Sequence, residues 1–171
     1  MCGIVGAVAE RDVVPILIEG LKRLEYRGYD SAGVATINYQ SNGLEYKKVT
    51  GKVHELETKL KDSYLYSSTG IAHTRWATHG KPSVENAHPQ ISRDVIAIVH
   101  NGIIENHLKL RTYLEQRGYE FNSDTDTEVL AHLIHYNFDR DLKIAIRKAL
   151  KLVKGTYAIA VISPKEPGRL I

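Results

Sequence analysis

A tight turn early in the chain constrains the fold most. Residues 33–38 and 44–49 each have the apolar and β-branched pattern of a strand, and Ser41-Asn42-Gly43 separates them. Asn-Gly between two such runs is typical of a β-hairpin, because these residues adopt the positive φ that a tight turn requires. The chain is therefore expected to pair strands antiparallel, which argues against a doubly wound parallel sheet.

The rest of the chain alternates short strands with amphipathic helices. Further strands are expected at residues 2–9, 70–76, 95–99 and 156–162. Helices are expected between Asp12 and Gly28, at 53–60, from Asn106 to Arg117, at 127–137, and from Asp141 to about Gly155, with Asp12, Asn106 and Asp141 as caps. Strands and helices interleave without a regular parallel alternation, which indicates an α+β or layered sandwich arrangement.

Composition limits the class of protein. The 171 residues fit one domain, and the net charge of +3 comes from Lys and Arg scattered among acidic residues, which gives no support for nucleic acid binding. No apolar run approaches the roughly 18 residues that span a bilayer, and no secretory signal is recognisable. We therefore expect no membrane association and a cytoplasmic location.

Cys2 is the only cysteine, so it cannot form an internal disulfide. Removal of Met1 would leave Cys2 with a free α-amino group, whose reference pKa is about 8. Such an amine can accept the thiol proton, so nucleophile and base would share one residue. By its position alone, Cys2 is more readily explained as an incidental buried residue.

Six sequence segments, in a fixed order along the chain, indicate a function for the Cys2 thiol. They are CGIVGA at 2–7, LEYRGYDSAG at 24–33, HTRWATHG at 73–80, NAHP at 86–89, HNGIIENH at 100–107 and SDTDTEV at 123–129. Together they resemble the class II glutamine amidotransferases throughout the chain. The forms RLEYRGYDSAG and HTRWATHG are similar to those of the glucosamine-6-phosphate synthase branch of that family.

The resemblance implies an N-terminal nucleophile hydrolase fold. This is a four-layer α/β/β/α sandwich of two antiparallel sheets between helical layers, with the nucleophile at the tip of a central strand. In the family the glutaminase domain continues beyond this length and is followed by an isomerase domain. Residues 1–171 are therefore expected to be a glutaminase domain that is incomplete at its C-terminal end and has exposed sheet edges.

The resemblance also implies an activity. L-Glutamine would be hydrolysed to glutamate and ammonia through Cys2, without a cofactor. In the full-length enzyme the ammonia would pass to fructose 6-phosphate in the isomerase domain and form glucosamine 6-phosphate. That enzyme could be a homodimer.

The family motifs assign an oxyanion site to Asn101 and Gly102. Attack on a carboxamide creates an oxyanion, which the side-chain amide of Asn101 and the backbone N–H of Gly102 would stabilise. Asn-Gly at the end of a strand suits this role. The alternative is a plain hairpin turn, for which Asn-Gly is the commonest signal.

Two charged residues match the family's recognition of the amino-acid end of glutamine. Arg75 can bind the α-carboxylate bidentately, and Asp126, at the opening of a helix, can accept the α-ammonium. The alternatives are a surface arginine for Arg75 and a helix cap for Asp126, with Asp124 as the rival cap.

Four further residues match family motifs with supporting roles. Thr78 and His79 correspond to the glutamine-binding loop, and Trp76 to the residue that gates the passage of ammonia, although an isolated tryptophan is more often core. Arg27 belongs to the segment that orders the site near the nucleophile. Gly28 and Gly33 of the same segment could serve turn geometry alone.

The sequence gives little support for a metal-binding site. The eight histidines follow no zinc-binding pattern, and Asp124, Asp126 and Glu128 lack the glycine and distal glutamate of a calcium loop, so no metal is expected. His132 and His135 fit a partly exposed helical face. Another N-terminal nucleophile hydrolase and a non-catalytic regulatory module that keeps the fold remain open.

Overall fold

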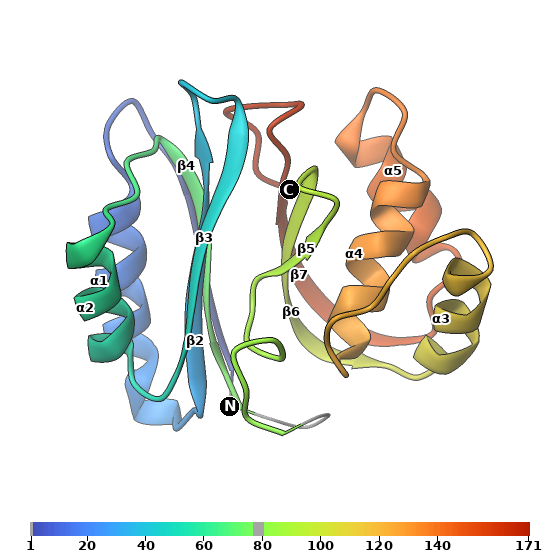
Figure 1. Ribbon diagram of the computed structural model, residues 1–171, viewed down its shortest axis with the longest axis horizontal. Helices are drawn as coiled ribbons and strands as arrows, with labels where there is room; N and C mark the ends of the chain where they lie inside the picture. The colour runs from blue at the N-terminus through green and yellow to red at the C-terminus, as the bar shows by residue number, and fades with distance from the viewer. Residues whose placement is uncertain (1, 77–80) are drawn as a thin grey trace.

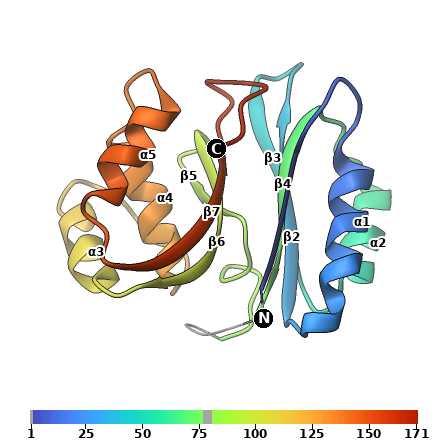
Figure 2. The ribbon, with the colours of Figure 1, turned by 180° about the vertical axis from the view of Figure 1, so that it is seen from behind.

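The computed structural model describes residues 2–76 and 81–171, which form four layers (Figure 1). Two helices cover one antiparallel sheet, a second antiparallel sheet stacks against it, and three helices cover the outer face of the second sheet. The same order of layers is visible from behind (Figure 2). The predicted α/β/β/α sandwich is confirmed.

The first sheet has the strand order β1-β4-β2-β3 and is antiparallel throughout. Its strands are β1 (Gly3–Val8), β2 (Ser31–Asn38), β3 (Gly43–Thr50) and β4 (Thr69–Arg75). Its covering helices are α1 (Val14–Leu24), continued by the 3-10 turn η1 (Glu25–Arg27), and α2 (Val53–Asp62). Asn42 has φ of 50° in the β2–β3 connection, so the predicted hairpin is confirmed.

The second sheet has the order β5-β6-β7 and is also antiparallel. Its strands are β5 (Gln90–Ser92), β6 (Ile96–Ile104) and β7 (Gly155–Ile162). Its helices are α3 (His107–Glu115), α4 (Asp126–Tyr136) and α5 (Leu142–Leu150). Among the residues that the structure describes, no helix has the length and apolarity needed to cross a membrane.

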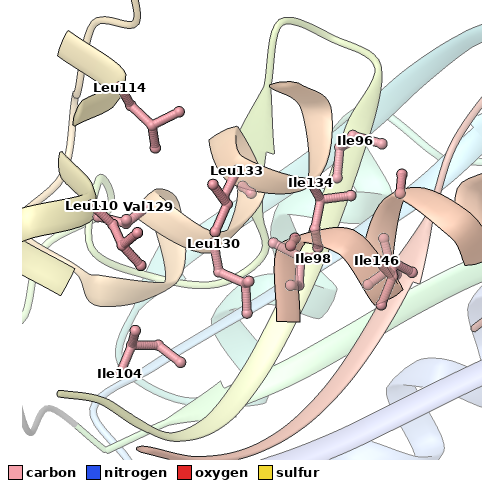
Figure 3. Close-up of a cluster of buried hydrophobic side chains, with 14 of the residues drawn as sticks. Ile96, Ile98, Ile104, Leu110, Leu114, Val129, Leu130, Leu133, Ile134 and Ile146 are labelled. Atoms are coloured by element: carbon pink, nitrogen blue, oxygen red, sulfur yellow. The ribbon is translucent and has the colours of Figure 1, made fainter. Parts of the chain in front are cut away.

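Strand alternation separates the layers, because successive side chains point to opposite faces of a sheet. In β4, Ala72 packs in the cluster with α1 and α2, whereas Ile71 packs between the two sheets with Val99 of β6. On the outer face of β6, Ile98 contributes to the largest cluster, which α4 fills with apolar side chains such as Leu130 (Figure 3). Both faces of each sheet are therefore buried over part of their area.

One predicted strand end was wrong, and one predicted cap makes different hydrogen bonds. Strand β6 does not end at residue 99 but continues through Asn101 and Gly102, because these residues pair with Ala158 and Tyr157 of β7. Asn106 occupies the N-cap position of α3 as predicted, but its side chain makes no capping hydrogen bond. Its Nδ2 instead donates to Leu152 O, and its Oδ1 accepts from the Lys154 N–H.

The other two predicted caps bond as expected. Asp141 accepts a hydrogen bond from the Ile144 N–H at the start of α5, and Asp12 accepts one from the Val14 N–H at the start of α1. The N-cap position of α1 is nevertheless Val13, one residue after Asp12.

Candidate active site

A cavity of about 760 Å³ opens where β1 begins and β4 ends. It gathers every predicted site residue that the structure describes: Cys2, Arg27, Arg75, Trp76, Asn101, Gly102 and Asp126. Thr78 and His79 lie outside the described residues. Residues that are up to 124 positions apart in the sequence, Cys2 and Asp126, therefore line one cavity.

Cys2 directly precedes β1 and is half-buried. The Trp76 N–H donates a hydrogen bond to Cys2 Sγ over 3.2 Å. The Cys2 thiol also donates a hydrogen bond to Trp76 O over 3.7 Å, so the main chain of Trp76 positions the sulfur at the cavity. The Trp76 side chain is 52% exposed, so it is not the core residue that its isolated occurrence in the sequence would suggest.

Asn101 and Gly102 lie within β6, so the hairpin-turn alternative is wrong. Gly102 has φ of 140°, and a Cβ there would lie 2.0 Å from Thr156 O, so no larger residue fits this backbone. The Asn101 Nδ2 donates to Cys2 O over 3.4 Å. Its carboxamide therefore lies beside the residue that carries the thiol.

Gly33 is explained in a similar way. It lies inside β2 and not in a turn, and a Cβ there would lie 2.1 Å from the backbone oxygen of His88. The glycine is needed for this close approach of the loop before β5. Gly28, in contrast, has φ of 73° at the end of η1, as a turn glycine would.

Arg75 is buried at the end of β4, with 4% of its surface exposed, so it is not a surface arginine. Its guanidinium lies 4.0 Å from Asp30 Oδ1, an ion pair that limits where the side chain can point. A cation held in a concave, largely desolvated position attracts a carboxylate more strongly than one in open water.

Asp126 is the first residue of α4 and is buried. Its Oδ2 accepts a hydrogen bond from the Ile104 N–H over 2.7 Å. Neither Asp126 nor Asp124 caps the helix; the cap is Thr125, whose side chain accepts a hydrogen bond from the Glu128 N–H. The carboxylate of Asp126 is thus positioned by β6, the strand that also carries Asn101.

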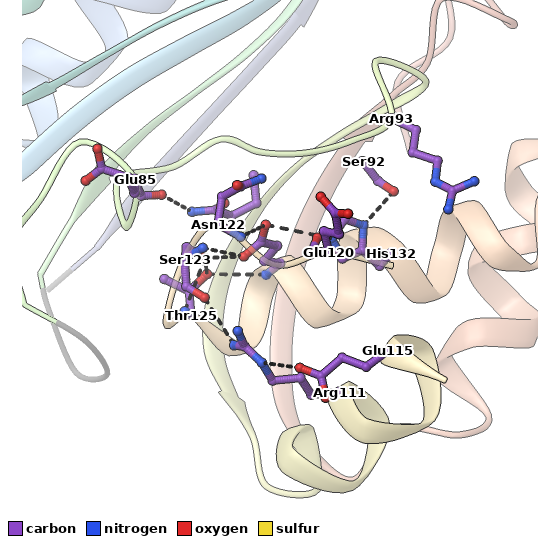
Figure 4. A network of polar contacts seen from close by, with 12 residues as sticks. Glu85, Ser92, Arg93, Arg111, Glu115, Glu120, Asn122, Ser123, Thr125 and His132 are labelled. Carbon is purple, nitrogen blue, oxygen red and sulfur yellow. Dashed lines mark hydrogen bonds and ion pairs between the residues drawn. The ribbon is translucent and has the colours of Figure 1, made fainter. Parts of the chain in front are cut away.

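A buried polar network supports the segment before α4 (Figure 4). Glu128 accepts hydrogen bonds from the backbone N–H groups of Asn122 and Ser123 over 2.9 and 2.7 Å. Burial acts to raise the pKa of Glu128, but the bonds from His132, Asn122 and Ser123 outweigh it, so this pKa is lowered. The carboxylate stays ionised, and its hydrogen bonds fix the loop that leads into Asp126.

His132 takes part in the same network. It is buried and contacts Ser92 Oγ and Glu120 O, so the predicted exposed face for His132 was wrong. The helix turns this ring toward β5 instead of toward solvent.

Sequence reasoning missed a cluster of buried polar residues, of which His88, His100 and Thr127 line the cavity. Thr127 Oγ1 lies 2.8 Å from His88 Nε2 and 2.9 Å from His100 Nδ1. The His73 and His88 rings stack with centroids 4.4 Å apart, and His73 Nε2 lies 2.7 Å from Asn101 Oδ1. The cluster connects the oxyanion candidate to the start of α4.

These histidines are held neutral. Burial lowers the pKa of His73 to about 4 and lowers the pKa of His88 well below its ordinary value. Burial also lowers the pKa of His100, although Asp126 and the Thr156 carbonyl act to raise it. Each neutral ring offers one N–H donor and one acceptor, so the cluster can fix orientations by hydrogen bonds.

One signal could have identified the cluster. His73 stands two residues after Ile71, on the face of the strand that alternation directs inward, and a buried polar residue at such a position needs a partner. The histidines were instead considered as metal ligands. Among the described residues, no group of three His, Cys, Asp or Glu side chains is arranged to hold a metal ion.

A family model described as "Glutamine amidotransferase domain" matches residues 73–171, which is more than half of the chain. The chain belongs to this family. The matched residues include the end of β4 and all of β6 and α4, the elements that carry Arg75, Asn101 and Asp126.

Curated relatives indicate a branch within this family. The chain is 54% identical over 173 residues to the glutamine–fructose-6-phosphate aminotransferase (isomerizing) of Legionella pneumophila strain Paris and 56% identical to that of Pseudomonas putida KT2440. Both matches cover 100% of this chain and 28% of the relative, so the chain spans less than a third of these proteins. It corresponds to their N-terminal glutamine amidotransferase domain.

Solved structures agree with the family assignment. The glutamine phosphoribosylpyrophosphate amidotransferase of B. subtilis matches with a TM-score of 0.80 and 29% identity over 96% of this chain and 35% of that one. A structure described as the allosteric regulatory enzyme of purine biosynthesis matches with a TM-score of 0.81 and 31% identity over 96% and 36%. The amidotransferase domain therefore has the N-terminal nucleophile hydrolase fold that the motifs implied.

Proposed function

We propose that residues 1–171 form a glutaminase domain that hydrolyses L-glutamine to glutamate and ammonia through Cys2. The observation that carries the proposal is the shared cavity: the thiol of Cys2, the amide of Asn101 and the charges of Arg75 and Asp126 all line it. A nucleophile, an oxyanion donor and two opposite charges are what cleavage of an amino-acid side-chain amide requires.

Cleavage would proceed by acyl transfer. The Cys2 thiolate attacks the glutamine carboxamide carbon, and the Asn101 Nδ2 and the Gly102 N–H stabilise the tetrahedral oxyanion. Expulsion of ammonia leaves a γ-glutamyl thioester on Cys2. Water then attacks the thioester, which releases glutamate and regenerates the thiol.

Proton transfer would be the task of the Cys2 α-amino group. After removal of Met1, this amine can take the thiol proton and pass a proton to the leaving ammonia. The position of Cys2 directly before β1 keeps its amine and its thiol at the same end of the cavity.

Recognition would use the two buried charges. Arg75, oriented by Asp30, binds the α-carboxylate, and Asp126, held by the Ile104 N–H, binds the α-ammonium. The motif match assigns further contacts with glutamine to Thr78 and His79. Arg27 lines the same cavity as Cys2 and would help to order it.

In the longer protein we propose that ammonia passes to fructose 6-phosphate in an isomerase domain and yields glucosamine 6-phosphate. This extension rests on the names of the relatives, which include fructose 6-phosphate and isomerizing activity. Trp76, exposed at the cavity, would gate this passage. We place the whole enzyme in the cytoplasm, with a homodimer as its expected assembly.

The test uses a reactive glutamine analogue. The purified chain is exposed briefly to 6-diazo-5-oxo-norleucine, and its intact mass and peptide map are recorded with and without excess glutamine. We expect loss of Met1 and one adduct on Cys2 that glutamine suppresses. Cys2→Ala is the control, since it removes the thiol and keeps the recognition residues.

Ammonia and glutamate are then quantified in parallel with glutamine as substrate. A one-to-one yield supports glutamine hydrolysis over another N-terminal nucleophile activity. Retention of Met1, an adduct that glutamine does not suppress, or equal turnover by Cys2→Ala would refute the proposal.

A further inference from the structure

His73 has no role in the chemistry described above, yet it touches an oxyanion donor. It lies on β4 with no exposed surface, and Asn101 faces it from β6 of the other sheet. The His73 Nε2 is 2.7 Å from Asn101 Oδ1. This is the side of the Asn101 carboxamide opposite to the one that bonds Cys2 O.

Only one orientation of the Asn101 amide in its contact with His73 suits an oxyanion site. An amide oxygen accepts hydrogen bonds and never donates them, so His73 must carry its proton on Nε2. If the Asn101 amide were reversed, its NH₂ would face the ring and its oxygen would face Cys2 O, where two acceptors repel each other. The same reversal would present an oxygen to the developing oxyanion.

The surroundings of His73 keep its ring neutral. Burial lowers its pKa to about 4. Hydrogen bonds with Asn101 and with the His100 backbone act to raise this pKa, and the charges of His100 and Arg75 act to lower it. His88 stacks on the ring at 4.4 Å. A neutral imidazole has a single N–H, so the location of that proton determines which way the Asn101 amide points.

We propose that His73 is a positioning residue: its Nε2–H holds the Asn101 carboxamide so that the Nδ2 donor faces Cys2. This inference rests on the proposed glutaminase function and deepens it. His73 would contact neither glutamine nor the reacting atoms. Its effect would be transmitted through the orientation of Asn101 alone.

Variants of His73 separate this role from packing. His73→Phe keeps a ring of similar size but removes the donor, and we expect kcat to fall by roughly 10²-fold with little change in KM, as when an oxyanion donor is lost. His73→Gln places an N–H near the position of Nε2, and we expect it to restore kcat to within about tenfold of the wild type. Equal kcat in His73→Phe and the wild type would overturn the proposal.

A double-mutant cycle tests whether His73 acts through Asn101. In an Asn101→Ala background, His73→Phe should cause no further loss of kcat, because the group that it orients is gone. Additive losses would mean that His73 acts by another route. His135→Phe is the matched control: His135 is half-buried and bonded to the Tyr119 hydroxyl, far along α4 from Asp126, and its loss should leave kcat unchanged.

A measurement without turnover keeps the proposal testable if the chain is inactive or His73→Phe does not fold. The long-range ¹H–¹⁵N spectrum of the histidine side chains, assigned with His73→Gln, reports the tautomer of His73 at neutral pH. We expect the Nε2–H form. An Nδ1–H form would overturn the inference even in an active enzyme, whereas an inactive wild type with the Nε2–H form would count against the proposed function only.

Discussion

The side chains between the two sheets change from apolar to polar along β4 and β6. At one end, Ile71 of β4 and Val99 of β6 pack in a buried apolar cluster. Two residues further along each strand, on the same faces, stand His73 and Asn101, joined by a hydrogen bond of 2.7 Å. After another two residues, β4 ends at Arg75 in the cavity.

This contrast shows how one scaffold serves two tasks. The apolar end stabilises the stack of sheets by removing side chains from water, whereas the polar end holds donors and charges in fixed positions. Alternation along a strand makes the transition possible, because every second residue returns to the same face. Changes at the apolar end should therefore alter stability, and changes at the polar end should alter turnover.

The largest effect is expected from Cys2→Ala. Removal of the nucleophile should lower glutaminase turnover by roughly 10³-fold or more. Glutamine should still bind, because Arg75 and Asp126 remain. Ammonia release and a calorimetric titration with glutamine check the two parts, and unchanged ammonia release would exclude Cys2 as the nucleophile.

Asn101→Ala probes the polar end directly. Loss of one oxyanion donor should lower kcat by roughly 10²–10³-fold with little change in KM. Val99→Ala, two residues earlier on the same face, is the comparison, and it should keep kcat while lowering the free energy of unfolding. Steady-state kinetics of both variants test this prediction. A rise in KM alone for Asn101→Ala would mean that Asn101 is not an oxyanion donor.

Ile71→Ala probes the apolar end. Ile71 is fully buried between the sheets, so its truncation should lower the free energy of unfolding by about 2–5 kcal/mol. Urea denaturation measures the change. At temperatures where the variant is folded, its kcat should match the wild type, and a large loss of kcat would show that the two ends are not separate.

The polar end should also make stability depend on pH. The pKa of His73 is lowered from 6.5 to about 4 on folding, so the unfolded chain takes up this proton first as the pH falls. The stabilising contribution is complete above pH 6.5 and is lost as the pH falls toward 4, with a slope of up to ~1.4 kcal/mol per pH unit.

Urea denaturation across this range for the wild type and His73→Gln checks the prediction. The variant should lose less stability on acidification. It should keep part of the slope, because burial also lowers the pKa values of His88 and His100. Identical slopes for the two proteins would contradict the assignment to His73.

The smallest effect is expected from Thr125→Ala. Loss of the cap at the start of α4 should cost ~1 kcal/mol of stability. Because Asp126 follows directly, the KM for glutamine should also rise slightly. Thermal denaturation and initial-rate kinetics measure the two effects, and Asp141→Ala, which uncaps α5 away from the cavity, is the control for a change in stability alone.

Much of this organisation could be predicted from local sequence. The hairpin at Asn42-Gly43, the cap at Asp141 and the element order follow from turn chemistry and from apolar spacing, which act over a few residues. Cys2 and Arg75 were recognised because whole motifs surround them, and the cavity joins them as expected.

Predictions failed where a distant partner decides the conformation. A strand was expected to end at residue 99, but pairing with β7 keeps Asn101 and Gly102 within β6. Asn106 has the composition of a cap, but the loop at Leu152 and Lys154 takes up its amide. His132 fits an exposed face by spacing, but contacts with Ser92 and Glu120 bury it.

The sequence by itself determined the antiparallel class of the fold, the identity of the nucleophile candidate and the residue types available for an amide-cleaving site, because each follows from local backbone preferences or side-chain chemistry. Only the tertiary structure decided that His73 meets Asn101. That contact joins residues of different sheets whose distance of 2.7 Å depends on how the two sheets stack. Stacking is a property of the whole core, and no short segment contains it.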